Sequence, residues 1–512
     1  MKSLVIAEKP SVARDIARVL GANQKNGGIL EGKNYVVTWA LGHLVTLADP
    51  EEYDRKYEKW EMATLPMLPK EMKLVVIRQT GRQFSVVKTQ LFRKDIGEII
   101  IATDAGREGE LVARWILEKA NNKKPLKRLW ISSVTDKAIL DGFAHLKPGK
   151  SYEPLYHAAV ARAESDWIVG INATRALTCK YNAQLSCGRV QTPTLAMIAA
   201  REQEIRSFKP KSYYGLKAIA DGITFTWTDA RSGSSTFDKE RLQKLQSSGK
   251  NDFVITDIQK KEKHSFSPAL YDLTALQQEA NQRYGYSAKQ TLNIMQRLYE
   301  NHKILTYPRT DSRYLTEDMV GTLKERLQSC AVGPYKRVAL KLANKPIKAN
   351  KSFVNNKKVS DHHAIIPTEQ FVQLENMSNE ERKIYDMVVR RFLAVLCPAS
   401  EYEDTTVTAS YNNETFLAKG TIYKTPGWRE VYEDSNYSDV DCDEEELPMQ
   451  AASDSLMKLK SGMQLCVKTF AITEGKTKPP AYFTEGTLIA AMENPVKYLA
   501  NRDKTIVKTL GE

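Results

Sequence analysis

The sequence has few cysteines, and they are scattered. None of the six lies within three residues of another; they are Cys179, Cys187, Cys330, Cys397, Cys442 and Cys466. Zinc ribbons and dithiol redox sites both need closely paired cysteines of the C-x-x-C kind. The sequence therefore argues against both kinds of site and is typical of a cytosolic enzyme with reduced thiols.

Long apolar runs are also missing. No stretch approaches the roughly 20 apolar residues that a membrane-spanning helix requires. The chain opens on a short apolar run at residues 4–7 and has no long apolar core like that of a signal peptide. On these grounds we expect a cytoplasmic protein.

The charge is unbalanced toward basic residues. Lys and Arg number 75 against 62 Asp and Glu, which gives a formal net charge of +13. Six carboxylates fall within residues 439–446, a segment that we expect to form a surface loop, so the remainder is more basic still. A basic surface favours nucleic acid through phosphate neutralisation and counterion release, although charge alone is weak evidence.

The first 150 residues alternate apolar runs with helical patterns, as α/β units do. Residues 4–7 and 98–103 are the predicted buried strands, and each precedes an amphipathic helix. Thr135 is placed to cap a further helix.

The rest of the chain interleaves helical and strand-rich regions. Helical spacing is found at 151–206 and 273–400, where Ser287 is a predicted cap, and alternating strand patterns are found at 211–262, 404–423 and 464–472. The predicted fold class is therefore a multidomain protein with an α/β region, helical regions and a β-rich region.

Acidic residues follow both predicted strands of the α/β region. Glu8 and Lys9 follow the first, and Asp104 and Glu108 follow the second. Carboxyl ends of neighbouring parallel strands share one edge of a sheet, where oxygen ligands suit Mg²⁺. The alternative is a helix start with favourable N-terminal carboxylates, which is the better interpretation for Glu110 and stays open for Glu108.

A tyrosine in a polar setting is the candidate nucleophile. Tyr307 lies in the run T-Y-P-R-T-D-S, in which Arg309 offers a fixed positive charge to a phosphate oxygen. A tyrosine can attack a phosphodiester and keep the cut end bound covalently. Most tyrosines are packing residues, and only the basic and polar neighbours favour the catalytic interpretation here.

Two further groups of residues are candidates for binding. The adjacent His362 and His363 lack a nearby cysteine, so a hydrogen bond to a phosphate or to the tyrosine site is favoured over zinc, with a buried structural histidine as the alternative. Cationic and amide side chains between 162 and 192 suit a single-stranded backbone. The alternative is a solvated helix face, with Trp167 as a core residue.

Five separated motifs together resemble the type IA DNA topoisomerases over essentially the whole chain. They are I-A-E-K-P-S, T-D-A-G-R-E-G-E, G-R-V-Q-T-P-T-L, Y-P-R-T-D-S and H-H-A-I-I-P-T. The first two look like the metal-binding motifs of the Toprim domain. The tract I-N-A-T-R-A and the lack of C-terminal cysteine tetrads resemble the topoisomerase III kind.

The resemblance implies a torus of four domains. These are a Toprim domain at 1–150, a helical gate-base domain at 151–210 and 474–512, a β-rich arch at 211–272 and 401–473, and a winged-helix-like domain with the tyrosine at 273–400. It also implies ATP-independent relaxation or decatenation by a monomer, with DNA as substrate and a helicase as a possible class of partner.

The resemblance assigns roles to the site residues. Tyr307 would form a 5′-phosphotyrosyl link, with Glu8 as general acid and Lys9 and Arg309 stabilising phosphate charge. Glu8, Asp104 and Glu108 would hold Mg²⁺, and His362 is the family histidine. The implied DNA contacts are Arg162, Arg175, Arg189, Gln191, Thr192, Asp311 and Ser312.

The sequence departs from the family pattern in two places. Gly106 stands where D-x-D-x-E has its second Asp, so we expect weaker or water-mediated magnesium binding at a single site. The sequence ends at Glu512 where the family continues, from which we expect an incompletely closed torus and low processivity. Two rival functions stay open: a Toprim-type nuclease or primase, and a non-catalytic protein that binds single-stranded DNA.

Overall fold

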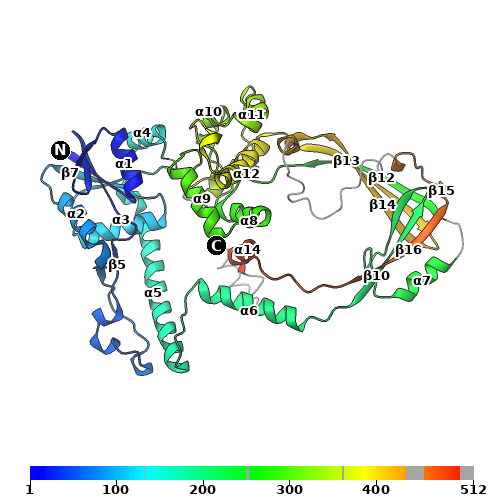
Figure 1. The fold of residues 1–512 in the computed structure, drawn as a ribbon, viewed down its shortest axis with the longest axis horizontal. Helices are drawn as coiled ribbons and strands as arrows, with labels where there is room; N and C mark the ends of the chain where they lie inside the picture. Colours follow the sequence, from blue (N-terminus) through cyan, green and yellow to red (C-terminus); the bar gives the residue numbers. More distant parts are fainter. Residues whose placement is uncertain (133, 249–252, 360–361, 434–454, 496–512) are drawn as a thin grey trace. The chain divides into compact units, whose positions relative to one another are not determined.

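The computed structural model forms two compact units, each assembled from segments far apart in the sequence (Figure 1). The first unit comprises Met1–Ile198, Leu270–Val389 and Thr484–Glu512, and the second comprises Ala199–Ala269 and Arg390–Phe483. The structure describes residues 1–132, 134–248, 253–359, 362–433 and 455–495. The acidic segment 439–446 and the last residues of the chain lie outside these ranges.

The first unit begins with a seven-stranded sheet. In spatial order its strands are β2 (Gln24–Asn26), β3 (Ile29–Glu31), β4 (Tyr35–Trp39), β1 (Lys2–Ala7), β7 (Ile96–Ala102), β8 (Leu126–Arg128) and β9 (Lys147–Pro148). The four central strands, β4, β1, β7 and β8, are parallel to one another. The two predicted strands, β1 and β7, are confirmed as central neighbours, and burial on both faces explains their unbroken apolar sequences.

Helices cover both faces of this sheet. Leu4 and Ile6 of β1 point to one face, where they pack with residues of α2 (Gly81–Leu91) and α3 (Arg107–Lys119). Val5 and Ala7 point to the other face, where α1 (Pro10–Val19) and α4 (Asp136–Ala144) pack. Thr135 accepts a hydrogen bond from the Ala138 amide, which confirms the predicted cap of α4.

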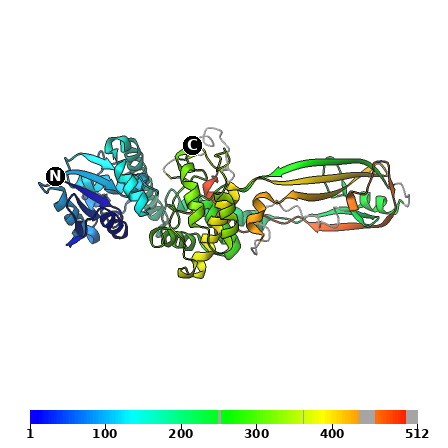
Figure 2. The ribbon, with the colours of Figure 1, turned by 90° about the horizontal axis from the view of Figure 1, so that it is seen from above.

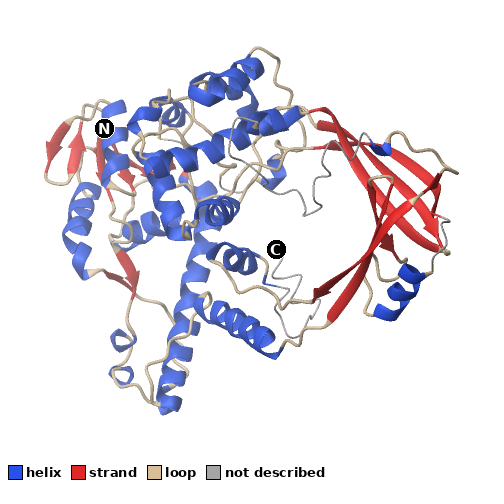
Figure 3. Cartoon of the chain, turned by 45° about the vertical axis from the view of Figure 1, so that its right-hand side comes forward, coloured by secondary structure: helices blue, strands red, loops and turns tan. Residues whose placement is uncertain are grey.

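An irregular segment between two short strands lies against the longest helix of the first unit. Strands β5 (Val45–Leu47) and β6 (Leu74–Val76) flank three 3-10 turns, η1 (Pro50–Glu52), η2 (Arg55–Tyr57) and η3 (Met62–Thr64). Helix α5 (Glu153–Tyr181) holds this segment beside it (Figure 3). The Trp167 indole donates to the Ala48 carbonyl at 3.0 Å, and Arg175 donates to the Tyr57 carbonyl at 2.5 Å.

The remaining part of the first unit is helical, as predicted. Its helices are α8 (Leu273–Tyr284), α9 (Ala288–Glu300), α10 (Leu323–Ser329), α11 (Lys336–Ala343), most of α12 (Asn379–Leu396) and α14 (Glu485–Glu493). Ser287 caps α9 through the Gln290 amide, as expected. Helix α14 returns from the end of the described chain to α8, where the Gly486 amide donates to Asn281 at 3.1 Å.

The second unit is built on an antiparallel sheet of seven strands, drawn in red in Figure 3. In spatial order these are β15 (Gln464–Leu465), β12 (Phe253–Ser265), β13 (Ser400–Tyr411), β14 (Glu414–Thr425), β11 (Ile223–Thr228), β10 (Ser212–Ala220) and β16 (Val467–Lys476). The long strands β12 and β13 run side by side (Figure 2).

Aromatic side chains dominate the core of the second unit. Phe225, Phe253 and Phe416 are fully buried against one another, with ring centroids 5.1 and 5.3 Å apart around Phe253. Helix α7 (Lys239–Ser247), which the strand patterns did not predict, buries Leu242 in this core. Helix α6 (Gln191–Ser207) runs from the first unit into the second.

Among the described residues, no helix is both long enough and apolar enough to cross a membrane.

An ion-pair network at the sheet edge gives the first testable prediction. Glu31 accepts from Arg93 at 2.6 Å and from Lys2 at 2.5 Å, and the Arg93 hydrogen bonds lower the pKa of Glu31 to about 2. A carboxylate with a depressed pKa stabilises the fold above its unfolded pKa, and the contribution is lost as the pH falls through the folded pKa. Glu31→Gln should therefore cost roughly 1–3 kcal/mol at about pH 7 in urea unfolding.

The cost of Glu31→Gln should shrink when the same unfolding curves are recorded at about pH 3.5. A loss of stability that is equal at both pH values would contradict an ionic origin.

Candidate active site

The site starts where two parallel strands end side by side. Ala7 of β1 pairs with Ala102 of β7, so the residues that follow them meet at the same edge of the sheet. There the Asp104 amide donates to the Glu8 carboxylate at 2.9 Å. Lys9, the next residue, is the N-cap of α1, and Pro10 starts that helix. The structure thus brings Glu8 and Asp104 together, as the sequence predicted.

A buried ion pair shapes the loop that carries Asp104. Arg128 on β8 is fully buried, pairs with Glu110 at 2.6 Å, and donates to the carbonyl oxygens of Thr103 and Asp104, each at 2.7 Å. The Thr103 hydroxyl also donates to the Gly109 carbonyl at 2.7 Å. Glu110 is therefore a structural residue, in line with the alternative interpretation of the sequence, and it fixes the loop through Arg128.

The two central carboxylates favour a proton or a cation between them. Burial raises the pKa of Glu8 first of all, and the negative charge of Asp104 raises it further. Burial also raises the pKa of Asp104. Two such groups repel each other unless positive charge joins them, so the pair suits a hard cation with oxygen ligands.

Glu108 lies apart from these two carboxylates. Its side chain is 68% exposed, and His43 contacts it at 3.4 Å and lowers its pKa by hydrogen bonding. Among the described residues, no three His, Cys, Asp or Glu side chains are grouped closely enough to hold a metal ion. A two-carboxylate site formed by Glu8 and Asp104 is what the geometry fits.

Tyr307 reaches this edge from a distant part of the chain. Its hydroxyl donates to the Asp104 carboxylate at 3.1 Å, and its amide donates to the Ser132 carbonyl at 3.0 Å. The ring packs edge-on against Tyr299 of α9, with centroids 5.5 Å apart, and only 8% of the residue is exposed. Burial, and then the charge of Asp104, raise the pKa of Tyr307 well above that of an ordinary phenol. The exposed Arg309 acts in the opposite direction and lowers it.

The two adjacent histidines point to different surroundings. The His362 ring lies 4.3 Å from the Tyr307 ring, and its Nδ1 pairs with the Ser132 hydroxyl at 3.0 Å. Burial lowers the pKa of His362 to about 3, so the ring is neutral. Its Nε2 is buried and has no partner of good hydrogen-bond geometry among the described residues, although the Ala105 backbone is close enough to influence the pKa. His363 instead bonds the Ala364 carbonyl at 2.7 Å and is a structural residue.

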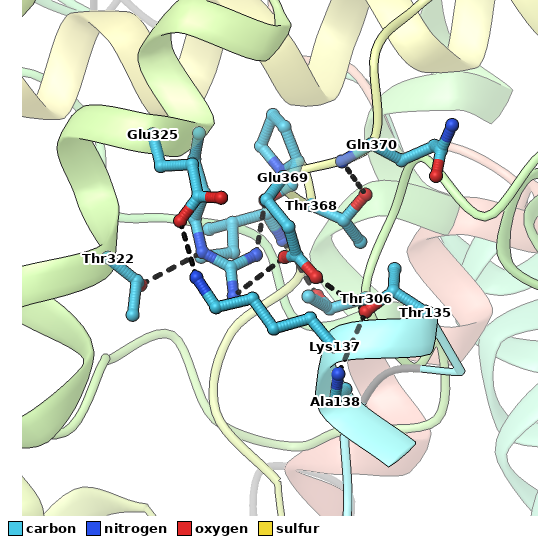
Figure 4. A network of polar contacts seen from close by, with 12 residues as sticks. Thr135, Lys137, Ala138, Thr306, Thr322, Glu325, Thr368, Glu369 and Gln370 are labelled. Atoms are coloured by element: carbon cyan, nitrogen blue, oxygen red, sulfur yellow. Dashed lines mark hydrogen bonds and ion pairs between the residues drawn. The ribbon is translucent and has the colours of Figure 1, made fainter. Parts of the chain in front are cut away.

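A polar network anchors the histidine segment beside the tyrosine segment (Figure 4). The Thr135 hydroxyl at the start of α4 donates to Glu369 at 2.5 Å, and Arg326 lies 3.6 Å from the same carboxylate. The Thr306 amide donates to the Ile366 carbonyl at 3.0 Å. These contacts explain how His362 and Tyr307, 55 positions apart, come to share one side of the site.

The residues predicted to contact DNA divide into accessible and buried groups. Arg162, Gln191 and Asp311 are exposed, and Arg189 pairs with Asp166 at 2.7 Å while about half its side chain stays exposed. Thr192, the second residue of α6, accepts a hydrogen bond from the Gly188 amide at 3.0 Å.

Two of the predicted DNA contacts are engaged in packing. Arg175 is buried, and its guanidinium lies 5.0 Å from the Trp60 ring as well as bonding Tyr57. Ser312 is buried, and its hydroxyl donates to the Lys358 carbonyl at 2.8 Å. For these two residues the geometry favours a structural role over a DNA contact.

Sequence reasoning missed four residues of the site: Arg128, Ser132, Tyr299 and Glu300. Glu300, the last residue of α9, accepts a hydrogen bond from the Lys9 ammonium at 2.8 Å. The only signal in the sequence was the place of Tyr299 on the predicted apolar face of its helix, which reads as core. Arg128, Ser132 and Glu300 could not be identified from the sequence, because their partners in the site lie far away along the chain.

Known protein families account for nearly the whole chain. A family model described as DNA topoisomerase matches residues 150–496, and a Toprim domain model matches residues 3–134. The chain belongs to the type IA DNA topoisomerase family.

The relatives that it resembles carry the name DNA topoisomerase 3. That of a Bacillus cereus strain is 59% identical over 511 residues, which cover 99% of this chain and 69% of the relative. That of Bacillus subtilis (strain 168) is 56% identical over 514 residues, covering 100% of this chain and 70% of the relative. The predicted kinship with the topoisomerase III kind is confirmed.

A solved structure supports the fold. Full-length topoisomerase I from Thermotoga maritima aligns with a TM-score of 0.69 at 24% identity, covering 99% of this chain and 77% of that one. At this identity the likeness concerns the fold alone, and the predicted fold class is confirmed. The boundaries of the four domains expected from the sequence stay predictions.

The tight loop around Asp104 gives the second testable prediction. A Cβ on Gly109 would lie 1.9 Å from the Asp104 carbonyl oxygen, closer than any real contact, and the obstacle is backbone. Gly109→Ala should therefore force the loop open, cost more than about 3 kcal/mol in urea unfolding and abolish DNA cleavage.

Gly81→Ala is the matched control. A Cβ there meets nothing within 4 Å, and the residue starts α2 with helical dihedrals, so a gain of about 0.4–1 kcal/mol is expected. Equal stability of the two variants would show that the loop does not depend on the Gly109 approach.

Proposed function

We propose that this protein changes DNA topology by cutting and resealing one strand through Tyr307 without ATP. The observation that carries the proposal is the Tyr307 hydroxyl, buried and hydrogen-bonded to Asp104 at 3.1 Å, beside Glu8 at the carboxyl ends of β1 and β7. Packing in an apolar core does not explain why two carboxylates that repel each other lie beside a buried tyrosine. Membership of the topoisomerase family supports the same reaction.

The cutting step transfers a phosphodiester to the tyrosine. The Tyr307 oxygen bonds to the scissile phosphorus while the bond from phosphorus to the 3′ oxygen breaks, which leaves a 5′-phosphotyrosyl link and a free 3′-hydroxyl. Asp104 already accepts the phenolic hydrogen bond and, with its pKa raised by burial, can take the proton. Since the link conserves the bond energy, the reverse reaction reseals the strand without ATP.

The departing 3′ oxygen needs a proton, and Glu8 is placed to hold one. Burial and the neighbouring Asp104 raise the pKa of Glu8, which favours the protonated form that a general acid requires. Positive charge from Lys9 and Arg309 would stabilise the phosphate as its charge redistributes. His362 is neutral, so we assign it a hydrogen-bonding role near the phosphate, with no charge contribution.

Magnesium is the cofactor that we propose for the carboxylate pair. Glu8 and Asp104 supply the hard oxygen ligands, whereas Glu108, which the sequence predicted as a third ligand, contacts His43 instead. A bound ion would neutralise the pair and hold the cut ends in line for resealing. Gly106 contributes no side chain, which favours a single site.

The substrate that we propose is single-stranded segments of supercoiled or linked DNA. Exposed Arg162 and Arg189 carry charge suited to phosphates, and Gln191 offers an amide donor. Relaxation and decatenation are two outcomes of one strand-passage reaction. A helicase partner, a monomeric state and a location at the bacterial nucleoid belong to the proposal and rest on the family alone.

The covalent link between Tyr307 and DNA can be trapped and detected. Wild-type protein incubated with single-stranded DNA should yield protein attached to the 5′ side of the break on a denaturing gel with end-labelled DNA. Tyr307→Phe should abolish this adduct, because it removes the only atom that attacks.

Tyr299→Phe is the control, since it keeps the ring that packs 5.5 Å from Tyr307 and loses only a hydroxyl. It should retain the adduct at near the wild-type level. DNA breaks that carry no attached protein and persist in Tyr307→Phe would indicate a nuclease. Binding of DNA without any breaks would indicate a non-catalytic protein.

The need for a metal ion can be tested with a chelator. Relaxation of negatively supercoiled plasmid should stop in excess chelator and return with added Mg²⁺, because the buried carboxylates repel each other without a cation. Topoisomer distributions on agarose measure the outcome. Undiminished relaxation in chelator would refute the magnesium assignment while leaving the role of Tyr307 intact.

A further inference from the structure

An ion pair links the residue after Glu8 to the helix that precedes the nucleophile. The Lys9 ammonium donates to the Glu300 carboxylate at 2.8 Å, with side chains 35% and 17% exposed. Gln296, one turn earlier on α9, donates its side-chain amide to the same carboxylate oxygen. We infer that Glu300 is a positioning residue that holds Lys9 ready for the scissile phosphate.

Lys9 needs such a partner because of its side chain and its place in the fold. It stands at the N-cap of α1, and a lysine stem of four carbons has many rotamers of similar energy. Glu300, by contrast, is fixed from its own helix by Gln296. The chain of contacts from Gln296 to Glu300 to Lys9 selects one direction for the ammonium.

The ion pair lies beside the reacting groups in the chain. Lys9 directly follows Glu8, whose carboxylate accepts the Asp104 amide at 2.9 Å. Asp104 is the group that accepts the Tyr307 hydrogen bond. Tyr299, adjacent to Glu300, packs against Tyr307, so one helix end both supports the nucleophile and holds Lys9.

A second ion pair of opposite polarity lies between the same two elements. Lys303, just beyond α9, contacts Asp15 of α1 at 2.6 Å. The cation Lys9 and the anion Asp15 therefore belong to the α1 side. Their partners, Glu300 and Lys303, belong to the α9 side. Asp15–Lys303 joins the same two elements six residues further along the chain from Lys9, whereas Lys9–Glu300 orients the ammonium itself.

The inference deepens the proposed function, since it rests on cleavage by Tyr307, and a double-mutant cycle tests it. Single-turnover rates of adduct formation on single-stranded DNA would be measured for wild type, Glu300→Gln, Lys9→Gln and the double variant. Glu300→Gln keeps the shape of the side chain and removes its charge, and we expect a loss of about tenfold. In the Lys9→Gln background the same change should alter the rate by less than about twofold, because Glu300 acts through Lys9.

Asp15→Asn is the matched control, because it removes one charge from the parallel ion pair, away from the reacting groups. It should leave the single-turnover rate of folded protein unchanged. Thermal unfolding of every variant verifies folding, and Glu300→Asp should recover part of the rate.

Two results would overturn the inference. One is a Glu300→Gln rate equal to that of wild type. The other is a tenfold loss that persists in the Lys9→Gln background, which would mean a structural role independent of Lys9. If Tyr307→Phe still formed the adduct, the proposed function would fail first; if Tyr307→Phe is inactive and the cycle shows no coupling, only the role of Glu300 fails.

Discussion

The site depends on the forced proximity of two carboxylates. Parallel pairing of β1 and β7 places Glu8 and Asp104 at one sheet edge, where burial raises the pKa of both. The surrounding residues offset part of their repulsion, and a bound cation would offset the rest. Arg128 donates to the Asp104 carbonyl, and the Tyr307 hydroxyl donates to the Asp104 carboxylate. The hydrogen bond from Tyr307 to the negatively charged Asp104 thus holds the nucleophile at this edge of the sheet.

Much of this arrangement could be predicted from the sequence. Unbroken apolar runs identified β1 and β7, and the rule that parallel strands end at a common edge brought Glu8 and Asp104 together. Capping residues fixed the start of two helices, at Thr135 and Ser287. The placement of Tyr307 followed from motif resemblance, since no periodic pattern connects residues 203 positions apart.

Other features could not be predicted, because they depend on packing between distant segments. Nothing local marks Arg128 as the partner of Glu110, or His43 as the contact of the exposed Glu108. Arg175 and Ser312 have polar side chains that suit DNA, yet long-range contacts bury both. Residues 48–73 form only short 3-10 turns, and their apolar residues follow no helical or strand spacing. Their packing against α5 could therefore not be predicted from the sequence.

Relaxation of a negatively supercoiled plasmid in Mg²⁺ without ATP tests the central claim most directly. If the acidic edge and Tyr307 cut and reseal one strand at a time, agarose gels should show a ladder of topoisomers whose linking numbers differ by one, converging on the relaxed circle. Nicked circles without a ladder would mean that the site cuts and does not reseal. Unchanged supercoiled plasmid, bound by the protein, would mean that the site does not cut at all.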